Sequence, residues 1–150
     1  MSFYAAAREG VTPVAGNVLL ALTTGTDEFC KLTEIGVSGE GTSSTVNRMA
    51  VRRSTANGTT ATTQTPQKNQ PWSQAAITQA ATTFTGAEPT TASVALWTYA
   101  FNVYGGVIRW IAAPGMELMI LGSTAGNSEV SLESSSGTGQ ISCQLIWEEP

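Results

Sequence analysis

Residues 97–103 alternate strictly between large apolar and small or polar side chains, and this period of two constrains the fold more than any other feature. Trp97, Tyr99, Phe101 and Val103 occupy the odd positions, with Thr, Ala and Asn between them. Successive side chains of a β-strand point to opposite faces, whereas an amphipathic helix has a period of 3.6 residues. The pattern therefore predicts a strand with one face in a core.

The C-terminal segment repeats this alternation. Ile141, Cys143, Leu145 and Trp147 share one expected face, and only Ile146 places an apolar side chain on the other. A strand with this pattern buries one face and leaves the other in contact with water.

Shorter apolar or β-branched segments between turn residues predict further strands. These segments are 2–7, 17–23, 28–38, 45–53, 107–113, 116–122 and 128–132. About eight short strands in one chain are typical of a sandwich or barrel. We therefore expect residues 1–150 to form one all-β domain, an antiparallel β-sandwich or jelly roll with a long polar loop and an N-terminal arm.

Turn residues separate the expected strands, at 25–27, 38–41, 104–106, 114–115, 126–127 and 137–139. The link from Tyr104 through two glycines to Val107 has the composition of a tight β-hairpin. We therefore expect strands 97–103 and 107–113 to be antiparallel neighbours, and hairpins to dominate the C-terminal half. This organisation disfavours a parallel α/β fold.

Two polar stretches interrupt the strand pattern. Residues 54–71 are rich in Thr, Asn, Gln and Gly and lack periodic apolar residues, which predicts a long loop and a candidate contact surface. Residues 78–91 predict a second extended excursion. Between them, the spacing of Trp72, Ala75, Ala76 and Gln79 after a proline predicts a short helix over 71–81.

The composition argues against enzymatic chemistry. The chain has no histidine, a single aspartate and 12% charged residues, and it lacks nucleophile and phosphate-binding motifs. The adjacent acidic pairs, Asp27-Glu28 and Glu148-Glu149, point to opposite faces of a strand, which predicts solvated carboxylates rather than a metal site. We expect a non-enzymatic protein without catalytic, cofactor-binding or metal-binding residues.

Charge and hydropathy narrow the partner classes. A net charge of −4, with only seven Lys and Arg residues, disfavours nucleic acid as a partner. The densest apolar stretch, 94–119, is interrupted by Asn102, Arg109 and Pro114, so no membrane span is expected. The N-terminal segment lacks the pattern of a secretory signal.

The two cysteines, Cys30 and Cys143, lie in separate expected strands. Unpaired cysteines in such positions are usually buried, so two buried thiols are the leading interpretation. A disulfide between the early and the terminal strand is the alternative.

Three arginines fall within six positions of one expected strand. Arg48 and Arg52 share a face opposite Met49 and Val51, and Arg53 follows directly. This arrangement suits salt bridges to an acidic partner, with a solvated strand face as the alternative. Trp72, after Pro71 at the end of the long loop, is the best candidate for an exposed aromatic contact.

Three segments together resemble a family of virion proteins. They are 32–43 (LTEIGVSGEGTS), 47–60 (NRMAVRRSTANGTT) and 144–149 (QLIWEE). Their strand, glycine turn and Arg-Arg-Ser loop resemble the jelly-roll cement or decoration proteins of tailed bacteriophages, over about half of the chain. The resemblance implies a homotrimer that binds the major capsid protein on the capsid exterior and that is found in the host cytoplasm during assembly. It carries over no catalytic or ligand-binding residue.

A cement protein bridges capsid subunits through many contacts from a rigid scaffold. Within this hypothesis, residues 2–7, including Phe3 and Tyr4, add as an edge strand to a neighbouring subunit. The loop 54–71, with Arg48, Arg52 and Arg53 at its base, rests on an acidic capsid surface.

Two other functions remain open. One is a tail, neck or fibre-tip module that binds a receptor or glycan, for which an exposed aromatic platform would serve. The other is a trimeric β-fold enzyme of the dUTPase kind, whose Asp-bearing substrate motif has no counterpart around Asp27.

Overall fold

A computed structural model describes residues 1–123 and 128–150, and these residues form β-strands and no helix. The strands are β1 Ser2–Val11, β2 Val18–Thr23, β3 Phe29–Gly39, β4 Val46–Ala56, β5 Ala61–Gln64, β6 Gln67–Lys68, β7 Gln79–Phe84, β8 Thr90–Thr91, β9 Trp97–Asn102, β10 Val107–Ile111, β11 Leu118–Leu121, β12 Glu129–Ser136 and β13 Ile141–Glu149. Each of the nine expected strands occurs. The expected turn at 126–127 lies outside the described residues.

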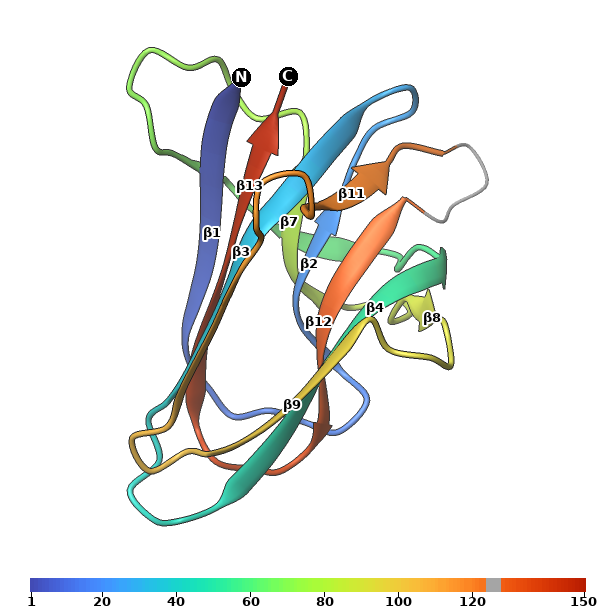
Figure 1. Cartoon of the computed structure of the whole chain (residues 1–150). Helices are drawn as coiled ribbons and strands as arrows, with labels where there is room; N and C mark the ends of the chain where they lie inside the picture. Colours follow the sequence, from blue (N-terminus) through green and yellow to red (C-terminus); the bar gives the residue numbers. More distant parts are fainter. Residues whose placement is uncertain (124–127) are drawn as a thin grey trace.

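The strands form two packed sheets (Figure 1). Sheet A has the order β10-β3-β13-β1-β6, with β11 beside β3; sheet B has the order β5-β7-β2-β12-β4-β8, with β9 beside β4. All pairings are antiparallel. The expected all-β antiparallel sandwich is confirmed, and both termini lie at the same end of it.

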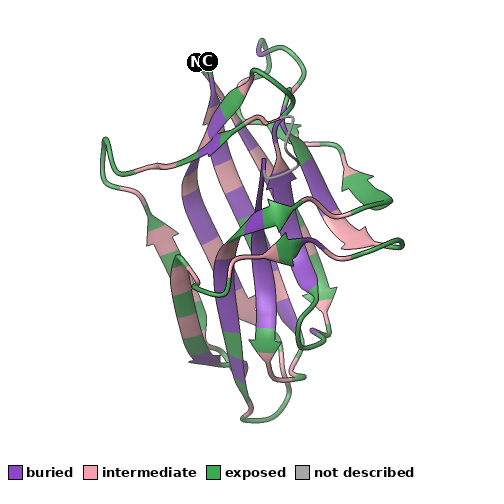
Figure 2. Cartoon of the chain, turned by 90° about the vertical axis from the view of Figure 1, so that its right-hand side faces the viewer, coloured by how far each residue is buried: buried purple, intermediate pink, exposed green. Residues whose placement is uncertain are grey.

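The core lies between the two sheets, where the alternating side chains of their central strands meet. Ile141, Cys143, Leu145 and Trp147 on β13 are buried as expected. They face apolar residues of β2, β4 and β12, including Leu20, Met49 and Leu132. Figure 2 shows this burial as bands on the central strands, with exposed residues gathered in the loops and on the outer strands.

The expected hairpin between β9 and β10 is wrong. β9 pairs with β4 in sheet B, whereas β10 pairs with β3 in sheet A. The inward rings of Trp97 on β9 and Trp110 on β10 lie with their centroids 4.5 Å apart. Two strands that pack aromatic rings against each other across the sandwich belong to opposite layers, so this turn carries the chain from one sheet to the other.

Hydrogen bonds to the β3–β4 connection hold this crossing turn. The buried Val103 donates its amide to the Thr45 carbonyl, at 2.9 Å, and its own carbonyl accepts from Gly41, at 3.0 Å. Gly39 donates to the Gly106 carbonyl, at 2.8 Å. The expectation of hairpins in the C-terminal half is also wrong, because no two consecutive strands from β9 to β13 pair within the described residues.

The expected helix over 71–81 is also wrong. Pro71 and Trp72 form a turn, and β7 begins at Gln79. The backbone amides of Ile77 and Thr78 each donate to the Glu149 carboxylate, at 2.8 Å. Tertiary hydrogen bonds thus satisfy amides that a helix would have used internally. They outweigh the helical spacing of the apolar residues in 71–81.

The stretch 54–71 is not one long loop, since β4 continues to Ala56 and the short strands β5 and β6 follow. The N-terminal segment is not a free arm either. β1 is paired along most of its length with β13, and Tyr4 and Ala5 also pair with β6. Among the described residues, no helix is long and apolar enough to cross a membrane.

Candidate interaction surface

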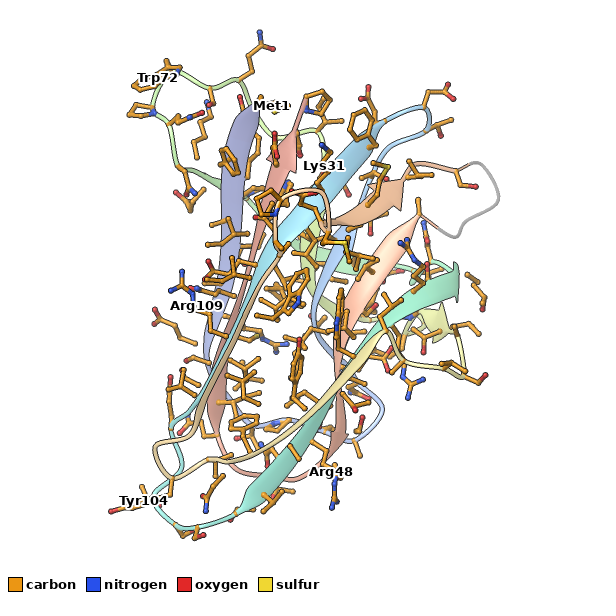
Figure 3. All side chains as sticks on the ribbon, in the orientation of Figure 1. Met1, Lys31, Arg48, Trp72, Tyr104 and Arg109 are labelled. Carbon is orange, nitrogen blue, oxygen red and sulfur yellow. The ribbon has the colours of Figure 1, made fainter. Side chains whose placement is uncertain are left out.

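The residues expected to contact a partner do not form one patch. Trp72 is 81% exposed, as expected, and lies near Met1 at one end of the sandwich, whereas Arg48 lies at the opposite end (Figure 3). Phe3 is partly buried on sheet A. Tyr4 is only 2% exposed and stacks on Trp147, with ring centroids 6.1 Å apart. Its side chain is therefore part of the core and unavailable to a partner.

The three arginines of β4 have different environments. Arg52 forms an ion pair with Glu133, at 3.3 Å, and donates to the carbonyls of Ala92 and Ser93. Arg53 donates to the Met119 carbonyl, at 2.8 Å, which ties β4 in sheet B to β11 in sheet A. Of the three, only Arg48 has neither an ion pair nor a side-chain hydrogen bond within the described residues. Two of the three guanidiniums thus stabilise the fold.

The Trp72 segment is fastened to the body of the sandwich on both sides. Before it, Asn69 donates its amide to the Phe3 carbonyl, at 3.0 Å. After it, the Tyr4 hydroxyl donates to the Gln74 carbonyl, at 2.9 Å, and Glu149 accepts the amides of Ile77 and Thr78. These hydrogen bonds fix the segments before and after Trp72, so the exposed indole is carried by an anchored loop.

The outer face of sheet A carries an apolar strip along its edge. The pairing registers place Ile111, Met119 and Leu121 of the edge strands, and Phe29 of β3, on the face turned away from the core. These four residues, here called the apolar ridge, are 57%, 41%, 59% and 37% exposed, respectively. The inward residues of the same edge strands, including Trp110 and Ile120, pack on the core. An edge strand that is apolar on both faces is typical of a strand covered on both faces.

A carboxylate and a guanidinium lie beside this ridge. Arg109 makes a two-pronged contact with Glu34, at 2.8 Å to each oxygen, and Gln144 donates to the same carboxylate at 3.1 Å. The hydrogen bond from Arg109 lowers the pKa of Glu34, although partial burial opposes this shift. Arg109 points away from the interior of the sandwich (Figure 3).

A shallow hollow of about 340 Å³ occupies the other end of the same face. It exists because the central positions of β3 and β13 there carry small residues, namely Gly36, Ser38 and Ser142. Val107 and Arg109 form one side, and Glu40, whose carboxylate contacts the Ser142 hydroxyl, forms another. The outer face thus has a raised apolar end and a recessed polar end.

The outer face of sheet B is already covered. Ala21 and Ala81, which face away from the main core, are buried in a small cluster with Phe84. The segment between β7 and β9 supplies Glu88, which accepts the Val18 amide, and the carbonyls that hold Arg52. The outer face of sheet A is therefore less covered by other segments than the outer face of sheet B.

Sequence reasoning missed the buried carboxylates. Glu149, expected to be solvated, is 3% exposed and also accepts the Trp147 indole N–H at 2.9 Å. Glu129 is buried near Thr23 and Ser131, and burial raises its pKa. The local sequences do not reveal this burial, because Ile77 and Thr78, which donate to Glu149, and Thr23, which donates to Glu129, lie far along the chain.

The two cysteines are unpaired and buried, which confirms the leading interpretation. Cys143 pairs with Val37 on β3, seven residues along that strand from Cys30. At about 3.3 Å per residue the two are roughly 20 Å apart along the sheet, far beyond the reach of a disulfide. Burial raises the pKa of each thiol to about 12.

The described residues contain no cluster of three His, Cys, Asp or Glu side chains that could hold a metal ion. The aromatic residues expected on β9 face inward: Phe101 is buried, and Trp97 and Tyr99 pack against the core. In comparisons with known proteins, the sequence matches no protein-family model and no curated protein.

Proposed function

We propose that this protein is a non-enzymatic structural component of a phage virion, a capsid cement or decoration protein that binds the head surface and stabilises contacts between major capsid subunits. The resemblance of three sequence segments to such proteins suggests this role. The observation that best supports it is the combination of a rigid sandwich with an anchored, exposed Trp72 segment at one end.

The strand order supports the jelly-roll part of the proposal. Strands β1 to β4 alternate between the two sheets, and β13 lies between β1 and β3 while β12 lies between β2 and β4. β10 completes sheet A and β9 completes sheet B, outside β3 and β4. This nested order of eight principal strands supports a jelly roll, in which β5 to β8 would be an insertion between the strands β4 and β9.

Trp72 is the residue best placed to contact the capsid. A tryptophan held on a fixed support loses little conformational entropy when it binds, and exposed tryptophans dominate many interfaces. The anchors on either side of Trp72 come from β1, β13 and the segment before β7. The insertion of the jelly roll would then serve as the capsid-binding element.

Binding to purified capsids that lack the protein tests this proposal. We expect wild-type protein to co-sediment with capsids at a fixed ratio and to raise the temperature at which they disrupt. Trp72→Ala should weaken binding by roughly tenfold or more. Val14→Ala, a change at another exposed apolar residue, is the matched control and should bind as wild type does.

Two outcomes would contradict the proposal. Wild-type protein that fails to bind capsids contradicts the cement role. Binding that Trp72→Ala leaves unchanged contradicts the assignment of the insertion as the capsid-binding element.

The hollow on sheet A favours a second candidate, a receptor- or glycan-binding module of a tail, neck or fibre tip. Gln144, Ser142, Glu40 and Arg109 place hydrogen-bonding groups around a recess of about 340 Å³. Sugar hydroxyls bind such groups. Saturable binding in a glycan array, lost in Gly36→Leu, which fills the recess, would favour this candidate over the first.

A further inference from the structure

We propose that Asn57 and Gly58 form a self-modification site, at which the folded chain promotes deamidation of Asn57 through a cyclic imide. This reaction is independent of the proposed capsid role, because it needs only this chain and water. Asn57-Gly58 is the only Asn-Gly pair in the sequence. Glycine adds no side chain beside its amide nitrogen, so this nitrogen can approach the asparagine side chain without steric hindrance.

The Asn-Gly pair lies where the end of β4 meets the start of β12. β4 ends at Ala56, and both Asn57 and Gly58 are half-buried. A Cβ at residue 58 would overlap the ring of Phe84 on β7, so only glycine fits there without a shift of that ring. The packing of β7 thus keeps an Asn-Gly pair at this position, next to the buried Glu129 of β12.

A buried carboxylate contacts the nitrogen that attacks. Gly58 donates its amide to Oε2 of Glu129, at 3.3 Å. Glu129 is 2% exposed and forms no ion pair within the described residues. Burial raises the pKa of its carboxyl group, which makes the ionised form a stronger base than an exposed carboxylate. Glu129 is therefore placed to take the Gly58 proton as the nitrogen attacks.

Two buried hydroxyls contact the amide group under attack. Ser54 Oγ lies 3.1 Å from Asn57 Oδ1, where its proton can stabilise the negative charge that develops on that oxygen. Ser54 Oγ also lies 3.1 Å from the Glu129 carbonyl and accepts the Glu129 amide, which fixes its position. Asn57 Nδ2, the leaving nitrogen, donates to Oγ of Ser128 at 3.0 Å. The base, the oxyanion donor and the leaving group are thus all held at one dipeptide.

The reaction balances with water as the only added reactant. The Gly58 nitrogen bonds to Cγ of Asn57, and its proton passes to Glu129. The Cγ–Nδ2 bond then breaks, and Nδ2 takes up the proton from Glu129 and leaves as ammonia. Water opens the cyclic imide at either of its two carbonyls, which leaves aspartate or isoaspartate at position 57. Nothing is oxidised or reduced, and the Glu129 carboxylate is regenerated.

Deamidation of Asn57 would weaken an anchor of the segment that covers sheet B. Two residues further on, Thr59 exchanges hydrogen bonds with Ala87 of that segment, each of 2.9 Å, through its amide and its hydroxyl. A carboxylate at position 57 loses the donor to Ser128 and places a second negative charge near Glu129. The modified chain should therefore melt at a lower temperature than the fresh chain.

Peptide mapping by mass spectrometry during a long incubation tests the proposal. Conversion is detected as the mass gain that replaces an amide NH2 by OH, and isoaspartate as a second product of the same mass. We expect Asn57 to convert roughly tenfold or more faster in the folded chain than in the guanidinium-denatured chain at the same pH and temperature. The denatured chain keeps the Asn-Gly pair but loses the contacts with Glu129 and Ser54, so it measures the intrinsic reactivity of the dipeptide.

Variants test the role of each contact. Glu129→Gln keeps an acceptor for the Gly58 amide but cannot take its proton, so it should slow conversion by roughly tenfold or more. Ser54→Ala, which removes the oxyanion donor, should slow it as well. Glu133→Gln is the matched control, because Glu133 is a carboxylate of the same strand that pairs with Arg52 instead, and it should convert as wild type does. Circular dichroism and melting temperature check that each variant folds.

Two results would overturn the proposal: a folded chain in which Asn57 converts no faster than in the denatured chain, or a folded Glu129→Gln variant that converts at the wild-type rate. Capsid binding is measured separately on freshly purified protein, so failure of the self-modification site is distinct from failure of the cement role.

Discussion

The guanidinium of Arg109 on β10 donates two hydrogen bonds of 2.8 Å to the carboxylate of Glu34 on the neighbouring strand β3. Both side chains lie on the outer face of sheet A. Both residues belong to regular strands, so their relative position is fixed by the β10–β3 register. The pair lies between the apolar ridge and the hollow. The two opposite charges neutralise each other at the centre of this face, and the hydrogen bonds fix their positions.

Loss of Arg109 should change the pH dependence of stability. Arg109 lowers the pKa of Glu34 below its usual value of 4.5, so the pair stabilises the folded state above that pH. This contribution is lost as the pH falls below 4.5 and through the pKa of Glu34 in the folded protein. Arg109→Met should therefore lower the urea midpoint at pH 6 more than at pH 3, and raise the pKa of Glu34 measured by NMR.

Arg48→Met is the control for this experiment, because Arg48 is exposed and forms no ion pair within the described residues. An equal effect of Arg109→Met at both pH values would contradict the stabilising role of the pair.

Glu149 should matter far more to stability than its neighbour Glu148. Glu149→Ala leaves the donors of Ile77, Thr78 and Trp147 without their acceptor, and each unsatisfied buried donor costs about 1–3 kcal/mol. We expect a loss of at least about 2 kcal/mol in the free energy of unfolding, measured by urea denaturation. Glu148→Ala, on the outward face of the same strand, should change it by less than about 0.5 kcal/mol. Equal effects of the two changes would show that the carboxylate does not anchor the segment.

Gly39 and Gly36 should respond differently to alanine. A Cβ at Gly39 would lie 2.3 Å from the backbone oxygen of Val103, in the turn that joins the two sheets. A Cβ at Gly36 would lie 2.9 Å from Cγ of Gln144, an exposed side chain that can rotate away. Gly39→Ala should therefore lower the melting temperature markedly, and Gly36→Ala only slightly. A reversed order would contradict the observed path of the crossing turn.

Both cysteines should be unreactive in the folded protein. Their thiols are buried, and burial raises each pKa to about 12, so little thiolate exists at pH 8. A thiol reagent such as dithionitrobenzoate should label neither residue under native conditions and both in denaturant. Rapid labelling of the native protein would contradict this burial, and a mass 2 Da below that of the reduced chain would reveal a disulfide.

The period-two pattern was sufficient to predict the strands but not their neighbours. β9 and β13 were predictable because one-sided burial imposes alternation on the sequence itself. The partner of β9 was not, because the two glycines between Tyr104 and Val107 suit a hairpin and a crossing turn equally. The deciding feature is the contact between Trp97 and Trp110, which depends on three-dimensional packing.

The exposure of Trp72 could be predicted from its local sequence. The environments of Tyr4 and Arg52 could not, because they depend on contacts with residues far along the chain. Trp72 follows a proline in a polar stretch and is exposed as predicted. The sequence predicts Tyr4 on an arm that pairs with a neighbouring subunit, but its ring stacks on Trp147 and its hydroxyl donates to the Gln74 carbonyl, both more than 60 residues away. Arg52 was predicted to face outward, and its salt bridge to Glu133 is internal to the chain.

The apolar ridge could have been recognised in the sequence as two adjacent segments that are apolar on both faces. Val107, Ile108 and Ile111, then Met119 and Leu121, break the alternation seen in β9. Such runs are also typical of strands buried inside a sheet. Only the position of β10 and β11 at the edge of sheet A distinguishes an exposed face from a covered one.

Quantitative mass spectrometry of purified virions from the source of this chain tests the cement role most directly. We expect a fixed ratio of this chain to the major capsid subunit, near one or a simple fraction set by the symmetry of the shell. Absence from virions, or only a handful of copies as in a tail or neck component, would contradict it.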